Sequence, residues 1–194
     1  IGVIWSSCSP DFGVQGVVDR FKQIEPKVLI TSDYYFYNGK KNNILEKIDD
    51  ILTKIESIKK VILFSYNSKN KNKINKYINF HEVISNSNLD ENFERFEFNH
   101  PIYILYSSGT TGKPKCITHG AGNVLIEHNK EFMLHCDIRR NEKIFYYTTT
   151  GWMMWNWLVG GLAIGASIYL FDGAPTYPKI DILLQYCQNK KINL

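Results

Sequence analysis

Nine consecutive residues, from Ser107 to Lys115, carry the side chains best suited to binding phosphate. They read Ser-Ser-Gly-Thr-Thr-Gly-Lys-Pro-Lys and directly follow a short apolar run, residues 102–106, that is typical of a buried strand. A triphosphate has several negative charges and many acceptor oxygens. Hydroxyl groups and the accessible N–H groups of a glycine-rich backbone donate to such oxygens, while Lys113 and Lys115 neutralise charge. We therefore predict that residues 107–115 form a phosphate loop.

This loop differs from the common P-loop of kinases and GTPases, in which Gly-x-x-x-x-Gly-Lys-Ser/Thr opens a helix. Gly109 and Gly112 are too close together for that pattern, and Pro114 follows Lys113. Because proline lacks a backbone donor and favours an extended neighbour, residues 115–118 are predicted to form a strand. The expected arrangement is a strand–loop–strand clamp. On composition alone, a hydrophilic hairpin tip without a binding function explains the loop equally well.

The elements that must position the loop alternate between helix and strand. A helical stripe is predicted to begin near Ser9, and residues 44–58 contain the clearest amphipathic helix. Short β-branched runs at residues 28–31 and 61–64 predict buried strands. This alternation is typical of an α/β fold with a mostly parallel sheet flanked by helices. Later segments predict strands at 143–148 and 167–171, and helices from about Trp155 and over 179–188.

Composition excludes several classes of protein. The net charge of +4 is mild, and the lysine–asparagine run at residues 69–73 is typical of a solvated loop, so no nucleic-acid partner is predicted. The four cysteines are scattered and none shows the spacing of a metal site, so we expect no metal centre and a reducing, cytoplasmic location. Residues 152–171 are almost entirely apolar and long enough for a membrane span. Gly160, Gly161 and Gly165 weaken a long helix, and residues 167–171 are typical of a strand. We therefore expect a buried helix followed by a buried strand instead of a membrane span.

The order of residues in the phosphate loop resembles the loop of the adenylate-forming superfamily, which includes acyl-CoA synthetases, firefly-type luciferases and adenylation domains of peptide synthetases. In that superfamily, the loop holds the β- and γ-phosphates of ATP while a carboxylate attacks the α-phosphate. The resemblance implies that ATP phosphates contact Ser107, Ser108, Gly109, Thr110, Thr111, Gly112, Lys113 and Lys115.

Further segments resemble one branch of that superfamily, the acetoacetyl-CoA synthetases. Residues 4–13, 20–27, 100–101, 115–117 and 119–122 carry this similarity. The stretch Thr-Gly-Trp-Met-Met-Trp-Asn-Trp-Leu-Val at residues 150–159 is similar to a segment that lines the acyl pocket of the branch. The resemblance implies an ATP- and Mg²⁺-dependent ligase that forms acetoacetyl-CoA from acetoacetate and CoA.

Two binding regions for the other substrates are expected from this resemblance. Thr149, Thr150, Gly151 and Trp152 come where a strand is predicted to end and a helix to begin, at the sheet edge where the phosphate loop is also expected. They are predicted to shape the acyl pocket with Trp152 as a wall, while most of the following aromatic side chains are expected in the core. Acetyl-CoA-type relatives place basic residues that meet CoA phosphates near residues 37–41. Lys40 and Lys41 are candidates for this role, and an ordinary basic turn explains them equally well.

The same resemblance places the adenylation lysine and the magnesium-linked glutamate downstream of Leu194, so no catalytic residue is assigned. Residues 1–194 are expected to be part of the large N-terminal AMP-binding domain, without the small C-terminal domain and inactive alone. His119 is expected near the nucleotide, without a role in proton transfer. Two alternatives remain: another short-chain acyl-CoA synthetase of the acetyl or propionyl type, and a short nucleotide-binding protein without catalysis.

Overall fold

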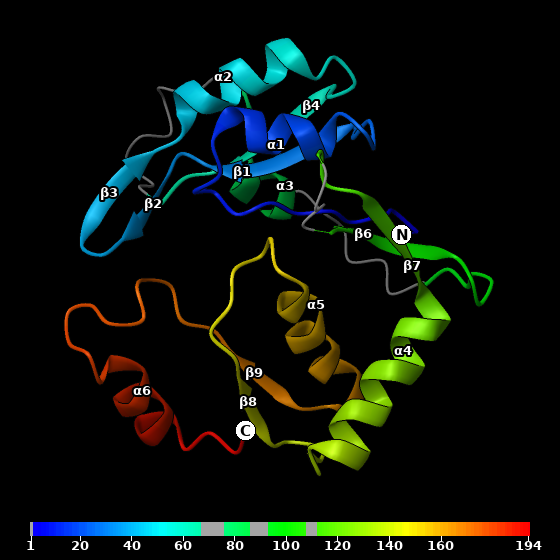
Figure 1. The fold of residues 1–194 in the computed structure, drawn as a ribbon, viewed down its shortest axis with the longest axis vertical. Helices are drawn as coiled ribbons and strands as arrows, with labels where there is room; N and C mark the ends of the chain where they lie inside the picture. Colours follow the sequence, from blue (N-terminus) through cyan, green and yellow to red (C-terminus); the bar gives the residue numbers. More distant parts are fainter. Residues whose placement is uncertain (1, 67–75, 86–92, 108–111) are drawn as a thin grey trace. The chain divides into compact units, whose positions relative to one another are not determined.

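The computed structural model of the protein describes residues 2–66, 76–85, 93–107 and 112–194. The chain divides into two compact units, and Figure 1 shows their elements. The N-terminal unit comprises Pro10–Phe93 and Tyr106–Cys116. The C-terminal unit comprises Ile1–Ser9, Glu94–Leu105 and Ile117–Leu194. Each unit combines helices with short strands, which confirms the predicted α/β class.

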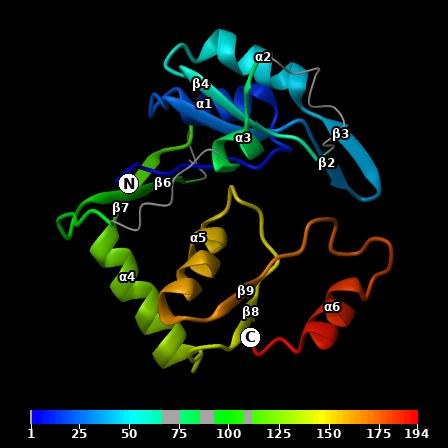
Figure 2. The same cartoon turned by 180° about the vertical axis from the view of Figure 1, so that it is seen from behind.

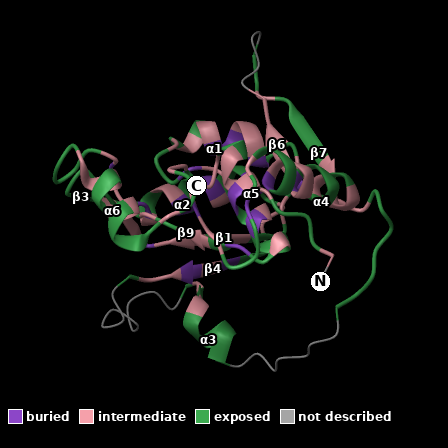
Figure 3. Cartoon of the chain, turned by 90° about the horizontal axis from the view of Figure 1, so that it is seen from below, coloured by how far each residue is buried: buried purple, intermediate pink, exposed green. Residues whose placement is uncertain are grey.

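The N-terminal unit is built around a small parallel sheet. Its elements, in chain order, are α1 (Val14–Phe21), β1 (Val28–Ser32), β2 (Tyr34–Tyr37), β3 (Lys40–Asn43), α2 (Leu45–Lys54), β4 (Lys60–Phe64), β5 (Ile78–Asn79) and α3 (Phe80–Ser85). The sheet has the order β1-β4-β5, and both of its strand pairs are parallel. Figures 1 and 3 show α1 and α2 on one face of this sheet and α3 on the other.

The core between α2 and β4 confirms the predicted amphipathic helix and the second predicted strand. Ile48 of α2 packs against Val61 and Leu63 of β4, and all three side chains are buried. Figure 3 shows buried, purple segments on β4. Because Val61 and Leu63 are two residues apart, they point to the same face of the sheet. This face is the one that α2 covers.

Two expectations about the N-terminal unit are wrong. β1 is an edge strand, and its Val28 and Ile30 side chains are each 47% exposed, so it is only half-buried. The first helix starts at Val14 after Gly13, which provides no side-chain cap, rather than near Ser9. The expected apolar stripe is present, however, because three of its members are buried: Val17, Val18 and Phe21.

The C-terminal unit contains two separate two-stranded sheets among its described residues. Its elements are β6 (Pro101–Tyr106) and β7 (Cys116–Gly120), whose end residues Tyr106 and Cys116 group with the N-terminal unit, then α4 (Ala121–Lys130), a π-helix (Glu131–His135), β8 (Lys143–Phe145), α5 (Met153–Gly160), a 3-10 helix (Gly161–Ile164), β9 (Ser167–Tyr169) and α6 (Ile182–Lys190). β6 pairs with β7, while β8 and β9 pair in parallel. The core of this unit is a cluster formed by Phe132, Ile138, Ile144, Leu158 and Ala166.

The apolar run at residues 152–171 folds as α5, the 3-10 helix and β9, which confirms the predicted helix followed by a strand. The strands predicted at 143–148 and 167–171 both end earlier than expected, β8 at Phe145 and β9 at Tyr169.

Helix α4 was not predicted. Its Leu125 and Ile126 side chains are 52% and 61% exposed, so the helix lacks a clean apolar stripe. Within the described residues, every helix is too short or too polar to cross a membrane.

Candidate functional site

The phosphate loop connects β6 to β7, which confirms the predicted strand–loop–strand order. The backbone N–H of Ser107 donates to the carbonyl oxygen of Lys115 at 3.0 Å, so the two arms of the loop are paired where they leave the strands. Four predicted phosphate ligands lie outside the described residues: Ser108, Gly109, Thr110 and Thr111. The described part of the loop consists of Ser107 and residues 112–115. We call residues 112–115 the second arm.

The second arm presents its positive charges to solvent. Lys113 and Lys115 are both exposed, and neither forms an ion pair with a described residue. Gly112 has a φ of 155°, which residues with a side chain rarely adopt, and a Cβ built at this position would have no neighbour within 4 Å. An open backbone followed by two exposed lysines suits a polyanionic ligand. The chemistry of these residues therefore fits a triphosphate.

The second arm also contacts the end of α1. The side-chain Nε2 of Gln23 donates to the carbonyl oxygen of Pro114 at 2.9 Å, across a sequence separation of 91 residues. A shallow depression of about 270 Å³ lies at this contact. It is lined by Gln15, Val18, Asp19, Lys22, Gln23 and Lys113. Sequence analysis did not identify Gln23, since no local pattern relates it to the loop.

The strand that leads into the loop, β6, has its own contact with α1. The guanidinium carbon of Arg20 lies 5.8 Å from the ring centroid of Tyr106, the last residue of β6, and 4.6 Å from the ring of Phe12. Arg20 also donates to the carbonyl oxygen of Gly16 at 2.8 Å, which fixes the side chain along the helix. α1 and the residues after it thus touch the chain on both sides of the loop.

The predicted acyl-pocket residues lie in the connection between β8 and α5. The backbone N–H of Trp152 donates to the carbonyl oxygen of Thr149 at 3.1 Å, which forms a turn just before α5. The Trp152 side chain is 65% exposed, and that of Met153 is 55% exposed. The exposure of Trp152 is consistent with its predicted role as a wall, whereas Met153 is not part of the core. Further along the helix, Leu158 is buried and Trp157 packs against the core cluster, as expected.

The N-terminal segment of the chain supports these residues. The Ser7 hydroxyl donates to the carbonyl oxygen of Thr150. A Cβ at Gly151 would lie 2.6 Å from the backbone nitrogen of Ser9, so only glycine fits this close approach of two backbones. Ser9 itself is buried. Ser7 and Ser9 belong to residues 4–13, which resemble the acetoacetyl-CoA synthetase branch. This segment thus packs against the candidate acyl pocket, a contact that the sequence did not indicate.

The two candidate sites do not share a sheet within the described residues. The phosphate loop follows β6 of the β6-β7 pair, and residues 149–152 follow β8 of the β8-β9 pair. The prediction of one common sheet edge is therefore wrong as far as strand pairing is concerned. Each site belongs to a different compact unit, apart from the strand residues that flank the loop.

Lys40 and Lys41 lie in a β-hairpin rather than a simple turn. β2 and β3 pair antiparallel from Tyr34↔Asn43 to Tyr37↔Lys40. The connecting Asn-Gly dipeptide is the strongest short signal for such a hairpin, although sequence analysis did not use it. The Nζ of Lys41 lies 3.7 Å from the ring centroid of Tyr34, a cation–π contact within the hairpin. Both lysines are exposed, so both alternatives for their role stay open.

His119 follows the phosphate loop on β7. Its ring lies 5.0 Å from the ring of Tyr103 on the neighbouring strand β6. Burial lowers the pKa of His119 below its ordinary value of 6.5 and raises the pKa of Tyr103 above 10.0. Both side chains therefore favour their neutral forms, and the aromatic contact is a structural role for His119.

All four cysteines are free of disulfide bonds. Among the residues that the structure describes, no group of three His, Cys, Asp or Glu side chains is arranged to hold a metal ion.

Comparison with known proteins adds to this geometry. The sequence matches the family described as AMP-binding enzyme over residues 1–194. It is 47% identical over 191 residues to the acetoacetyl-CoA synthetase of Gallus gallus, covering 94% of this chain and 29% of the relative. It is 45% identical over 188 residues to the acetoacetyl-coenzyme A synthetase of Rhizobium meliloti (strain 1021), covering 96% of this chain and 29% of the relative.

A solved structure gives the same picture of the fold. The acetoacetyl-CoA synthetase from Streptomyces lividans superposes with a TM-score of 0.92 at 38% sequence identity, over 99% of this chain and 29% of that chain. The chain therefore spans 29% of the length of each of these three relatives.

Proposed function

Because the chain belongs to the AMP-binding enzyme family, we propose that it is part of an ATP-dependent ligase that converts acetoacetate and CoA to acetoacetyl-CoA. The relatives named acetoacetyl-CoA synthetase support this choice of acid, at 45% and 47% identity. Residues 1–194 would then be part of the large N-terminal AMP-binding domain. A cytoplasmic location is part of the proposal, supported by the four cysteines, none of which forms a disulfide bond.

The observation that carries this proposal is the phosphate loop itself. A loop between two paired strands, tied at its base by Ser107 and Lys115, presents Lys113 and Lys115 to solvent beside the open backbone of Gly112. In the proposed enzyme, the loop binds the β- and γ-phosphates of ATP. Its contribution to catalysis is to position the nucleotide and to stabilise negative charge that builds on the leaving phosphates.

The proposed reaction has two steps. In the first, a carboxylate oxygen of the acid attacks the α-phosphorus of ATP, the bond to the β-phosphate oxygen breaks, and pyrophosphate leaves. In the second, the CoA thiolate attacks the acyl carbon and AMP leaves. Mg²⁺ would supply charge neutralisation on the triphosphate in the first step.

The other substrates are assigned to the remaining candidate residues. Thr149, Thr150, Gly151 and Trp152 would shape the acyl pocket, because the exposed Trp152 offers an apolar wall next to backbone polar groups. Lys40 would meet a phosphate of CoA, with Lys41 beside it in the same hairpin.

Replacement of Lys115 tests the proposal in the full-length protein. Lys115→Ala is expected to slow acetoacetate-dependent exchange of pyrophosphate into ATP about 100-fold, since one charged donor to the phosphates is lost. The melting temperature should stay close to that of the wild type, because the side chain is exposed. Lys54→Ala, at an exposed position near the end of α2, is the matched control and should change neither quantity. Equal exchange rates for Lys115→Ala and the wild type would rule out this role of the loop.

A further inference from the structure

Gln23, two residues beyond α1, links that helix to the second arm of the phosphate loop. We propose that Gln23 is a positioning residue: its side-chain amide fixes the second arm, and through it Lys113 and Lys115, in the conformation that binds the phosphates of ATP. This inference rests on the proposed function of the loop and adds a residue to it.

The geometry of the Gln23 amide supports a bridging role. Its Nε2 donates both to the carbonyl oxygen of Asp19 at 2.6 Å and to the carbonyl oxygen of Pro114 at 2.9 Å. An amide nitrogen has two N–H groups, so these two bonds use its full donor capacity. The side chain therefore joins one backbone carbonyl of α1 to one backbone carbonyl of the second arm.

The end of α1 explains why the side chain is held in this position. In a regular helix, the carbonyl of Asp19 would accept from the backbone N–H of Gln23, four residues later. Here that N–H donates to the carbonyl oxygen of Arg20 at 3.2 Å instead. The last turn of a helix leaves carbonyl groups without a backbone donor, and the Gln23 amide supplies one to Asp19. The helix end thus orients the amide toward Pro114.

Pro114 is a suitable point for such a link. Its ring fixes φ, so holding its carbonyl constrains the direction of the chain on either side. Lys113 and Lys115 are its immediate neighbours, and Lys113 lines the same depression as Gln23. The bond between Ser107 and Lys115 ties the second arm to β6, whereas the Gln23 bond ties it to α1. Two anchors on different elements define the orientation of the arm better than one.

The expected consequence is an effect on affinity rather than on chemistry. If the second arm occupies its binding conformation for a smaller fraction of the time, the apparent affinity for ATP decreases in proportion to that fraction. A neutral hydrogen bond of this kind changes such an equilibrium by about threefold to tenfold. Once ATP saturates the enzyme, the loop is in place and kcat changes little.

Gln23→Met in the full-length protein tests this, since methionine keeps the length of the side chain and removes the donor. The KM for MgATP in pyrophosphate exchange should rise about threefold to tenfold, with kcat within about twofold of the wild type. Gln15→Met is the matched control: Gln15 lines the same depression, but its Nε2 donates to Asp19 Oδ1 at 2.7 Å and does not reach the loop. It should leave both constants unchanged.

Limited digestion with trypsin in the absence of nucleotide gives a second readout. Trypsin cleaves poorly before proline, so within the second arm the bond after Lys115 is the susceptible one. Cleavage there, followed by the appearance of the peptide that begins at Cys116, reports how often the arm opens. The rate should increase about threefold to tenfold in Gln23→Met and stay unchanged in Gln15→Met.

The outcomes separate this inference from the proposed function. A wild-type KM and a wild-type cleavage rate for Gln23→Met would overturn the inference, as would a lower kcat at an unchanged KM. Faster cleavage of Gln23→Met in a protein whose wild type catalyses no pyrophosphate exchange would support the link between Gln23 and the arm and reject the proposed function.

Discussion

The imidazole of His128 on α4 lies directly against Gly160 at the end of α5. A Cβ built on Gly160 would come within 2.1 Å of His128 Nδ1 and 2.8 Å of its Cγ. His128 is 9% exposed, so the ring has little room to move away. The absence of a side chain at residue 160 therefore allows the two helices of the C-terminal unit to approach each other around a buried histidine.

Gly160→Ala is expected to destabilise the protein by about 1–3 kcal/mol, because the added methyl group forces the buried ring or a helix to shift. Chemical denaturation monitored by circular dichroism would measure this. Gly16→Ala is the matched control, since Gly16 also lies in a helix but its Cβ would meet no atom closer than 3.8 Å. That variant should gain about 0.5–1 kcal/mol from the better helix propensity of alanine. A Gly160→Ala variant that is as stable as the wild type, or more stable, would contradict the close approach.

Burial of His128 also predicts a dependence of stability on pH. Desolvation lowers its pKa below the ordinary 6.5; His119 acts in the same direction, while Glu127 and Glu131 oppose it. Below pH 6.5 the unfolded chain takes up a proton that the folded chain resists, so the free energy of unfolding falls as pH decreases. The slope from one such group is at most about 1.4 kcal/mol per pH unit. Well above pH 6.5, His128 is neutral in both the folded and the unfolded state, and its contribution to stability is fully present.

Denaturation curves between pH 5 and 7.5 would test this. His128→Gln should reduce the slope below pH 6.5, although part of it should remain because burial also lowers the pKa of His119. An unchanged slope for His128→Gln would show that this histidine is accessible to protons in the folded state.

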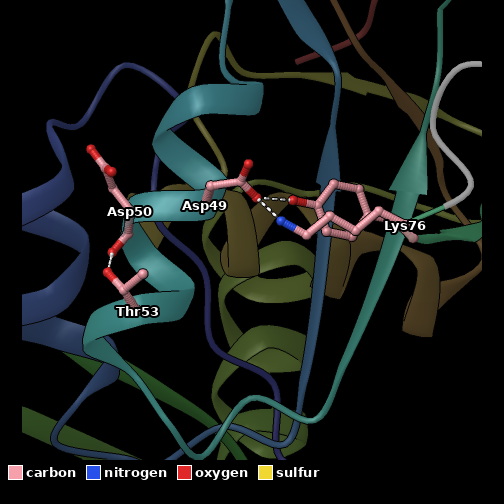
Figure 4. Close-up of polar contacts among 5 residues, drawn as sticks. Asp49, Asp50, Thr53 and Lys76 are labelled. Carbon is pink, nitrogen blue, oxygen red and sulfur yellow. Dashed lines mark hydrogen bonds and ion pairs between the residues drawn. The ribbon is translucent and has the colours of Figure 1, made fainter.

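Two aspartates of the N-terminal unit provide a contrast between buried and exposed carboxylates. Asp33 is 4% exposed at the carboxyl end of β1 and accepts from the Ser65 hydroxyl at 2.6 Å and from the Tyr34 N–H at 3.0 Å. Asp49 on α2 accepts from Lys76 Nζ at 2.6 Å, as Figure 4 shows, and also from the Tyr77 hydroxyl, but its side chain is 54% exposed.

Asp33→Ala is expected to cost about 3 kcal/mol, because the loss of a buried acceptor removes charge-assisted bonds that join the ends of β1 and β4. Asp49→Ala should change stability far less, since water replaces the partners of an exposed ion pair. Thermal melts of the two variants would compare them directly. If Asp49→Ala were the more damaging change, the exposed pair would have a structural role that its geometry does not indicate.

The sequence predicted those parts of the fold in which local pattern and burial coincide. The apolar stripe around Ile48 correctly predicted a helix, and the short apolar run at residues 61–64 correctly predicted a strand. Pro114 correctly predicted a strand rather than a helix after the phosphate loop, because the constraint that proline imposes is local. α4 escaped prediction since its exposed Leu125 and Ile126 blur the periodicity of its buried face.

The features of the candidate sites that the sequence could not predict are contacts between distant segments. The bond from Ser7 to Thr150 spans 143 residues, and that from Gln23 to Pro114 spans 91. No spacing rule connects such positions, because tertiary packing alone brings them together. The residue types of the phosphate loop were therefore predictable, whereas the residues that hold it were not.

The exposed side chain of Trp152 is the candidate determinant of which acid is used. Trp152 is 65% exposed although tryptophan is among the most apolar side chains, and its backbone N–H is already used by Thr149. An exposed indole that contributes little to the core is suited to contact a ligand. Trp152→Ala in the full-length protein should therefore lower kcat/KM for acetoacetate by about tenfold or more, while acetate, which is shorter, should be affected less.

The measurement is steady-state kinetics with acetoacetate, acetate and longer acids at saturating ATP and CoA. Leu184→Ala on α6 is the control, since Leu184 is 75% exposed and lies far along the chain from the candidate pocket. It should leave the ratios of kcat/KM among the acids unchanged. The melting temperature of Trp152→Ala should stay near that of the wild type, because truncation of an exposed side chain leaves the core intact. An identical preference among the acids would exclude Trp152 as a wall of the acyl pocket, even if overall activity fell.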